Sequence, residues 1–223
     1  MTVKLFCSAI AKFTLGVVLI GALLFLPAGT LHYPQGWLLM GILFIPMFLA
    51  GLVMMAKNPN LLRSRLNAKE KQLEQSLIVK LSGLMFLVGF ILAGLSFRFG
   101  WWMLPRWVGI LGAVLFLISY ALYAEVLREN TWLSRTIEVQ EGQQVVSSGL
   151  YGIVRHPMYA VTLVLFLSMP LVLGSALAFV VFLAYPAIIS GRIRNEEDVL
   201  TAELPGYAEY KQKVKWRLLP FIW

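Results

Sequence analysis

The sequence predicts an all-α integral membrane protein with about five to six transmembrane helices, four of them N-terminal spans followed by a C-terminal helical hairpin. Two observations predict this class. Of the 223 residues, 59% are hydrophobic and only 13% are charged, and the mean hydropathy is +0.77. A soluble domain is usually about half apolar and about a quarter charged. The apolar residues also gather in runs that are long enough to cross a bilayer.

Four runs meet the length of about 20 mostly apolar residues that a membrane-spanning helix needs: residues 9–28, 36–55, 79–97 and 104–124. A fifth run, residues 159–190, is too long for one simple span. Pro170 and Gly174 lie near its middle, where proline removes a helical hydrogen bond and glycine permits a turn. We predict two short helices in a hairpin here, with one long kinked helix as the alternative.

The distribution of charge orients the chain in the membrane. Suppose that the loops near residues 29–35 and 98–106 face outward. Of the 19 Lys and Arg residues, only Arg98 and Arg106 then lie on the outer side, and all eleven Asp and Glu residues lie on the inner side. The positive-inside rule then places both termini in the cytoplasm. The same rule explains the net charge of +8 without nucleic acid as a partner. We expect a multi-pass protein of a bacterial or archaeal inner membrane, or of the endoplasmic reticulum in a eukaryote.

The chain divides into a four-helix transmembrane region, residues 1–125, and a second region, residues 126–223, with a cytoplasmic loop, the hairpin and a C-terminal cytoplasmic helix. The polar loop 57–80 has mixed charge and is interpreted as a solvated or headgroup-facing surface without chemistry. A brief apolar–polar alternation in residues 135–146 indicates a small extended element. Cys7 is the one cysteine, so no intrachain disulfide can form, and no metal site is predicted.

Two polar clusters flank the hairpin and are the candidate functional residues. The first, in residues 148–159, contains Gly149, Tyr151, Arg155, His156, Pro157 and Tyr159, and the second contains Arg192, Glu196 and Glu197. Each has an ordinary explanation alone: a turn residue, a positive-inside anchor, or acidic residues in an exposed helical turn. A hairpin brings its two ends together, however, so the clusters should meet at the cytoplasmic membrane surface and form a site.

The order of these motifs resembles the isoprenylcysteine carboxyl methyltransferase family, which is related to phospholipid N-methyltransferases. The resemblance covers residues 130–221 and consists of Gly-x-Tyr-x-x-x-Arg-His-Pro-x-Tyr, Glu-Glu-x-x-Leu, Tyr-x-x-Tyr and a closing proline. The matching residues are Gly149, Tyr151, Arg155, His156, Pro157, Tyr159, Glu196, Glu197, Leu200, Tyr207, Tyr210 and Pro220. The resemblance implies a membrane-embedded methyltransferase that uses S-adenosyl-L-methionine and a cytoplasmic cofactor site in residues 126–223.

Under this resemblance, the expected cofactor-binding residues are Gly149, Tyr151, Arg155, His156, Pro157, Tyr159, Glu196 and Glu197. Arg192 and Glu196 are the expected catalytic residues. Arginine suits a carboxylate, and tyrosine faces suit adenine or a cationic sulfur. Arg192 could hold an acceptor carboxylate, whereas an amine acceptor would first lose a proton, to Glu196.

The leading functional hypothesis is therefore methyl transfer to a lipophilic or lipidated acceptor that arrives through the bilayer, with a prenylcysteine-type carboxylate as the first candidate. Three alternatives stay open: a phospholipid N-methyltransferase, an NADPH-dependent sterol-type reductase and a non-catalytic membrane partner protein. A transporter fits least well, because no acidic or basic residue lies inside any of the first four spans, where ion pathways usually show one.

Overall fold

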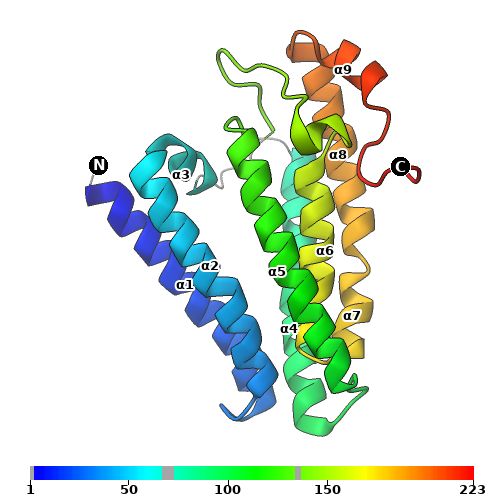
Figure 1. Ribbon diagram of the computed structural model, residues 1–223. Helices are drawn as coiled ribbons and strands as arrows, with labels where there is room; N and C mark the ends of the chain where they lie inside the picture. The colour runs from blue at the N-terminus through cyan, green and yellow to red at the C-terminus, as the bar shows by residue number, and fades with distance from the viewer. Residues whose placement is uncertain (1–2, 67–72, 134–136) are drawn as a thin grey trace.

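The computed structural model describes residues 3–66, 73–133 and 137–223, and these fold into a bundle of helices (Figure 1). In chain order the elements are α1 (Val3–Ala28), α2 (Pro34–Lys57), α3 (Pro59–Leu66), α4 (Leu73–Phe99), α5 (Arg106–Glu129), a 3-10 turn (Gly149–Gly152), α6 (Pro157–Val172), α7 (Ala176–Phe182), α8 (Tyr185–Glu203) and α9 (Tyr207–Lys213). The described residues contain no strand, and one isolated bridge joins Met103 to Ser175.

Within the described residues, five helical segments are long and apolar enough to cross a membrane. They are Lys4–Ala28, Pro34–Lys57, Gln75–Phe99, Arg106–Glu129 and Ala176–Glu203, and the last of these combines α7 and α8. The shorter α6 is also apolar. The predicted class, an all-α integral membrane protein with four N-terminal spans and a C-terminal hairpin, is confirmed. The division into regions 1–125 and 126–223 stays a prediction.

The fifth apolar run forms a hairpin of α6 against α7 and α8, as predicted, and not one kinked helix. Gly174 makes the turn with a φ of +71°, which glycine adopts without steric cost. The hydroxyl of Ser175 accepts a hydrogen bond from the Ala178 N–H at 3.1 Å and so caps α7. The Leu104 N–H donates to the Gly174 carbonyl at 2.8 Å, which ties the turn to the loop before α5.

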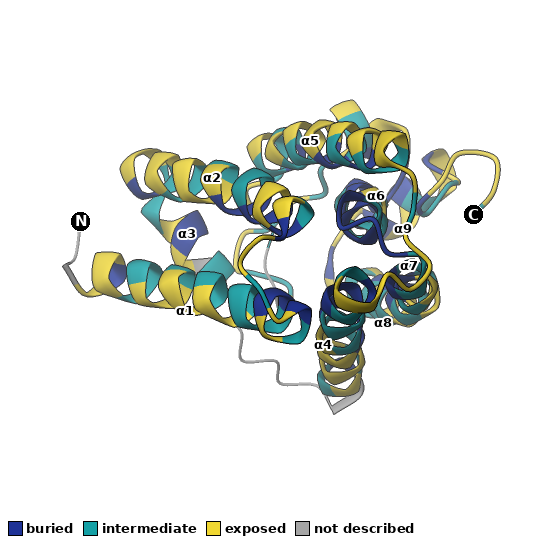
Figure 2. Ribbon diagram, turned by 90° about the horizontal axis from the view of Figure 1, so that it is seen from below, coloured by how far each residue is buried: buried dark blue, intermediate teal, exposed yellow. Residues whose placement is uncertain are grey.

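The helices pack around α6, which is largely buried between its neighbours (Figure 2). At Gly112 of α5, a Cβ would lie 2.9 Å from the Val172 N, so only glycine permits this close approach of α5 to α6. The pair α1–α2 meets the rest of the bundle at the end opposite α3 and leans away from it toward α3 (Figure 1). The α3 end also carries α9, so the short polar helices share one end of the molecule.

The polar segments outside the long apolar helices correct one prediction. Here α8 ends at Glu203, Gly206 has a φ of +84°, and α9 begins at Tyr207. The extended element expected in residues 135–146 is wrong for residues 137–146, which form no strand and turn at Glu141 and Gly142. Arg135 and Thr136 lie outside the described residues. The apolar side chain of Val139 packs against the cluster of Leu204, Tyr207, Tyr210 and Val214.

Candidate active site

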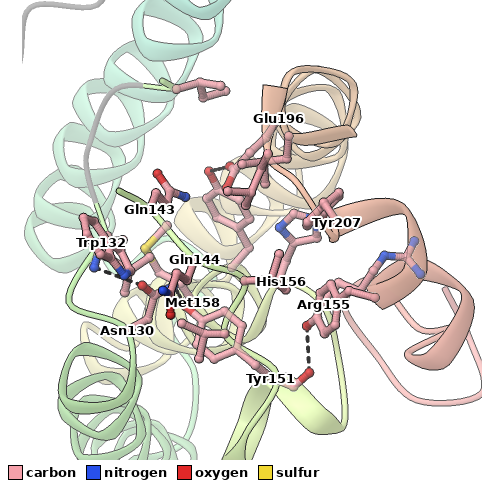
Figure 3. Close-up of a pocket in the computed structure, with 18 of the residues that line it drawn as sticks. Asn130, Trp132, Gln143, Gln144, Tyr151, Arg155, His156, Met158, Glu196 and Tyr207 are labelled. Carbon is pink, nitrogen blue, oxygen red and sulfur yellow. Dashed lines mark hydrogen bonds between the residues drawn. The ribbon is translucent and has the colours of Figure 1, made fainter. Parts of the chain in front are cut away.

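A pocket lies where α6 begins and α8 leaves the bundle, and three segments line it (Figure 3). In the close-up, Asn130, Trp132, Gln143 and Gln144 lie on one side, Glu196 and Tyr207 on the other, and His156 between them. The lining residues are Asn130, Trp132, Leu133, Ile137, Glu138, Gln143, Gln144, Val145, Val146, Tyr151, Arg155, His156, Met158, Tyr159, Arg192, Glu196, Leu200, Leu204, Tyr207 and Tyr210. The meeting of the two motif clusters, inferred from the hairpin, is therefore present in the structure.

Six of the nine predicted site residues line this pocket: Tyr151, Arg155, His156, Tyr159, Arg192 and Glu196. Gly149, Pro157 and Glu197 are not among the lining residues. Pro157 is the first residue of α6, where its fixed φ suits a helix start and its missing N–H costs nothing. Gly149 has a φ of +50°, and a Cβ there would lie 2.0 Å from the Glu129 carboxylate. Gly149 thus gives Glu129 room to accept from the Leu150 N–H at 3.2 Å.

A hydrogen-bonded group joins α6 to α8 at the pocket. The Tyr159 hydroxyl donates to the Glu196 carboxylate and accepts from Arg192 Nε at 3.0 Å. Arg192 and Glu196 are four residues apart on α8, so their side chains share a face. Both reach the same phenol, which fixes their relative positions.

Gln75, at the start of α4, braces Arg192 from a third helix. Its Oε1 accepts from Arg192 Nη1 at 2.9 Å, and its side chain is fully buried. No sequence pattern indicated Gln75 as a site residue, because it lies in the polar loop 57–80, which was interpreted as a solvated or headgroup-facing surface. Arg192 is thereby held from two directions, by a phenol and by an amide.

Glu197 is the centre of a buried ion cluster behind the pocket. Its Oε1 lies 2.6 Å from Arg155 Nε and 3.3 Å from His156 Nε2, and its Oε2 lies 2.9 Å from Arg217 Nε. The Glu197 side chain is only 2% exposed. An isolated carboxylate at this depth would be strongly disfavoured, and the guanidinium groups compensate it. Glu197 therefore positions Arg155 and His156, which do line the pocket.

The C-terminal segment is built into the same cluster. The Arg155 and His156 N–H groups donate to the Trp216 and Arg217 carbonyls, each at 2.9 Å. Arg155 Nη1 also donates to the Val214 and Lys215 carbonyls, each at 2.8 Å. These bonds fix the backbone just before α6, and with it the orientation of His156.

Three buried tyrosines form an aromatic wall of the pocket. Tyr210 donates to the Tyr151 carbonyl at 2.7 Å, and Tyr151 accepts from Asn130 Nδ2 at 3.0 Å. Burial raises the pKa of Tyr151, Tyr207 and Tyr210 above the usual phenol value, so all three hydroxyls stay protonated. The Tyr207 hydroxyl is buried and has no hydrogen-bond partner among the described residues, and a buried group of this kind calls for an explanation.

The polar loop before the 3-10 turn supplies the pocket residues that the sequence did not reveal, Asn130, Trp132, Gln143 and Gln144. The loop is held by its own bonds: the Trp132 N–H donates to Asn130 Oδ1 at 3.0 Å, and the Gln140 N–H donates to Gln143 Oε1 at 2.9 Å. An irregular loop has no hydropathy period, so pattern analysis could not single it out. Tyr207 and Tyr210 could have been found, since they belong to the motif that carried the resemblance.

Comparisons with known proteins agree with this architecture. Residues 110–202 match the model of the isoprenylcysteine carboxyl methyltransferase family. The mouse (Mus musculus) Delta(14)-sterol reductase TM7SF2 is 32% identical over 91 residues, which are 40% of this chain and 22% of the reductase. The Cupriavidus metallidurans cobalt-zinc-cadmium resistance protein CzcN is 32% identical over 131 residues, which are 56% of this chain and 57% of CzcN. The chain thus spans less than two thirds of either relative.

A solved structure shares the fold. The eukaryotic intramembrane Ras methyltransferase ICMT matches with a TM-score of 0.54 and 18% sequence identity, over 92% of this chain and 74% of that one. At this identity the likeness concerns the fold, while the sequence match concerns the hairpin and the helix before it. The family model thus matches residues 110–202, less than half of the chain, and the fold of the chain is similar to that of the Ras methyltransferase.

Proposed function

We propose that this protein transfers a methyl group from S-adenosyl-L-methionine to the carboxylate of a lipophilic acceptor of the prenylcysteine type. The observation that carries the proposal is the group of Arg192, Tyr159 and Glu196 in a pocket at the mouth of a membrane hairpin. The match of residues 110–202 to the family model supports methyl transfer. The chain spans less than two thirds of either curated relative, so their activities are not carried over to it. The proposed substrate and cofactor rest on the chemistry of the pocket.

The donor set suits S-adenosyl-L-methionine group by group. The aromatic and apolar walls, with Trp132, Tyr151 and Leu200, suit an adenine ring. Glu196 offers a carboxylate to an ammonium or to ribose hydroxyls. The Tyr207 hydroxyl, buried without a partner, is a donor and an acceptor that a polar cofactor group would satisfy. When bound, the cofactor supplies an electrophilic methyl group on a cationic sulfur.

The residues of the chain then have to orient an acceptor and exclude water. An acceptor carboxylate is already a nucleophile at neutral pH, so one of its oxygens forms the new C–O bond as the C–S bond breaks, and no residue removes a proton. Alignment dominates such a displacement. Arg192 is suited to hold the carboxylate because Gln75 and Tyr159 fix its guanidinium. An amine acceptor would use Glu196 as the base instead.

Titration with S-adenosylhomocysteine and, separately, with NADPH tests the cofactor. We expect the detergent-purified protein to bind S-adenosylhomocysteine and not NADPH. Glu196→Gln should weaken that binding by about ten-fold or more, because a hydrogen bond to a charged group contributes roughly 1.5–3 kcal/mol. The measurement is isothermal titration calorimetry of both variants.

Asp198→Asn is the matched control, because Asp198 lies on the same helix and is exposed. Its affinity should equal that of the wild type. Binding of NADPH alone would favour the reductase, and binding of neither ligand would favour a non-catalytic membrane partner. Equal affinity of Glu196→Gln and the wild type would remove Glu196 from the cofactor site.

We also propose that both termini and the α3 end of the bundle face the cytoplasm. The supporting observation is that Arg98, in the last turn of α4, and Arg106, the first residue of α5, lie at the opposite end of the bundle. The basic residues of α3 and α9, in contrast, lie at the α3 end. With Cys7 replaced, single cysteines at Asn60 and Gln212 should resist an impermeant maleimide in intact cells, and a cysteine at Trp102 should react. Labelling of the cysteine at position 60 or 212 from outside would contradict this orientation and favour the opposite one.

A further inference from the structure

Gln75, the first residue of the membrane-spanning segment in α4, has one amide atom that is bonded and one that is not. Its side chain is fully buried, and its Oε1 accepts from Arg192 Nη1 at 2.9 Å. Its Nε2 is also buried but has no hydrogen-bond partner among the described residues. A buried donor without a partner costs free energy, so this nitrogen calls for an explanation.

A rotated amide group would not remove the unpaired atom. The oxygen and the nitrogen of a glutamine amide are assigned from the hydrogen bonds that they make. Arg192 settles the assignment, because a guanidinium group only donates and therefore faces the carbonyl oxygen. Turning the amide by half a rotation would place two donors against each other and leave the oxygen unpaired. The unpaired atom of Gln75 is therefore a donor, and the group that satisfies it has to be an acceptor.

This donor lies directly behind residues that line the pocket. Arg192 lines the pocket, and so does Tyr159, which accepts from Arg192 Nε at 3.0 Å. The start of α4 packs against α8 here, since a Cβ on Gly191 would lie 3.7 Å from Ile78 Cδ1. Nε2 and Oε1 of Gln75 share one carbon, so the unpaired donor lies within one amide group of the atom that Arg192 contacts.

A ligand has to part the side chains around Arg192 before it can bind. The free volume of the pocket is about 90 Å³, below the range of about 300–1,000 Å³ typical of ligand sites. Gln75 is not among the lining residues, but it is the next polar side chain behind Arg192. A ligand group that lies against the guanidinium on this side therefore meets the amide as well.

The chemistry of the two side chains defines the ligand group. A carboxylate has two acceptor oxygens, which suit one guanidinium and one amide N–H, whereas an ammonium only donates and carries the same charge as Arg192. We propose that Gln75 binds the acceptor: its Nε2 donates to the acceptor carboxylate beside Arg192, and this bond selects a carboxylate over an amine. The inference rests on the proposed function, because it assigns the acceptor to the Arg192 side of the pocket.

Gln75→Glu separates the two amide atoms. It keeps an oxygen for Arg192 and replaces the unpaired donor with a second oxygen, at almost the same shape. The new carboxylate faces a guanidinium, so it is not an isolated buried charge. The measurement is isothermal titration calorimetry, with S-adenosylhomocysteine present, of three ligands that carry the same prenyl chain: an N-acetyl prenylcysteine, its carboxamide, and a prenylated cysteamine. Their polar groups are a carboxylate, a neutral amide and an amine.

We expect the wild type to bind the carboxylate about ten-fold or more tightly than the other two ligands, because a hydrogen bond to a charged group is a strong one. Gln75→Glu should reverse this order. Its carboxylate repels that of the ligand but accepts from the N–H groups of the carboxamide and the amine. Affinity for S-adenosylhomocysteine should change little. A purely structural defect would weaken all ligands together, so it could not produce the reversal.

Two further variants complete the test. Gln75→Met removes both polar atoms at similar length and should weaken binding of the carboxylate about ten-fold, without a gain for the amine. Gln212→Glu makes the same substitution at an exposed position of α9, outside the pocket, and should bind all three ligands as the wild type does.

Three results would each overturn the inference. If Gln75→Glu kept the wild-type order and affinities, Nε2 would not meet the acceptor, and the proposed function would stand. Equal weakening of all ligands, with S-adenosylhomocysteine among them, would reduce Gln75 to a structural support of Arg192. Preference of the wild type for the amine, or binding of none of the three ligands, would overturn the inference and the proposed acceptor together.

Discussion

Glu197→Ala is expected to lower the free energy of unfolding by about 3–5 kcal/mol, the range found when one partner of a buried ion pair is removed. The loss is large because Arg155 is 7% exposed and would keep its charge without a carboxylate beside it. Arg217, at 32% exposed, is partly solvated and adds less. The measurement is the denaturant or detergent-induced unfolding transition of the purified protein.

Asp198→Ala is the control, because it removes an acidic residue at the next position of α8, where the side chain is exposed. It should change stability by no more than a few tenths of a kcal/mol, as surface substitutions usually do. Because Glu197 holds two pocket residues, its loss should also weaken binding of S-adenosylhomocysteine. Stability close to that of Asp198→Ala would show that the Glu197 cluster contributes little to the fold.

The adjacent residues Glu196 and Glu197 show how far the sequence could define this site. The motif named both as cofactor residues, and the structure places only Glu196 at the pocket. Successive residues of a helix point about 100° apart, since each turn contains 3.6 residues. One of the pair must therefore face another direction, but which one depends on the rotation of α8. Packing of α8 against the C-terminal segment sets that rotation, and no local pattern encodes it.

Spans and hairpin were predictable because the bilayer imposes a length and a composition that a single sequence displays directly. The hairpin then predicted that its two polar ends meet, and they do. Prediction failed where the structure depends on contacts between distant segments. Gln75 and Arg65 come from the polar loop 57–80, yet one reaches Arg192 and the other reaches Tyr123. Only the packing of α4 and α3 against α8 and α5 brings them there.

Arg192→Ala is expected to reduce methyl transfer by about a hundred-fold or more, since a small misplacement of a reacting group can have an effect of that size. Affinity for S-adenosylhomocysteine should fall little, because the role assigned to Arg192 concerns the acceptor. Arg192→Lys should restore little activity. A lysine is a point charge and cannot donate to Tyr159 and Gln75 while also presenting a planar fork to a carboxylate. The assay is transfer from labelled S-adenosyl-L-methionine to a prenylcysteine analogue and to a membrane lipid extract.

Arg194→Ala is the control for this assay, because Arg194 is exposed on the same helix and does not line the pocket. It should retain full activity, which separates the role of the guanidinium in the pocket from the general attraction of basic residues to anionic lipid. Full activity of Arg192→Lys would mean that Arg192 only anchors α8 to the headgroup layer. Label found in the lipid extract and not in the prenylcysteine analogue would favour a phospholipid amine as the acceptor. Glu196 would then be the base that removes a proton from the amine, and Glu196→Gln should lose turnover with that acceptor.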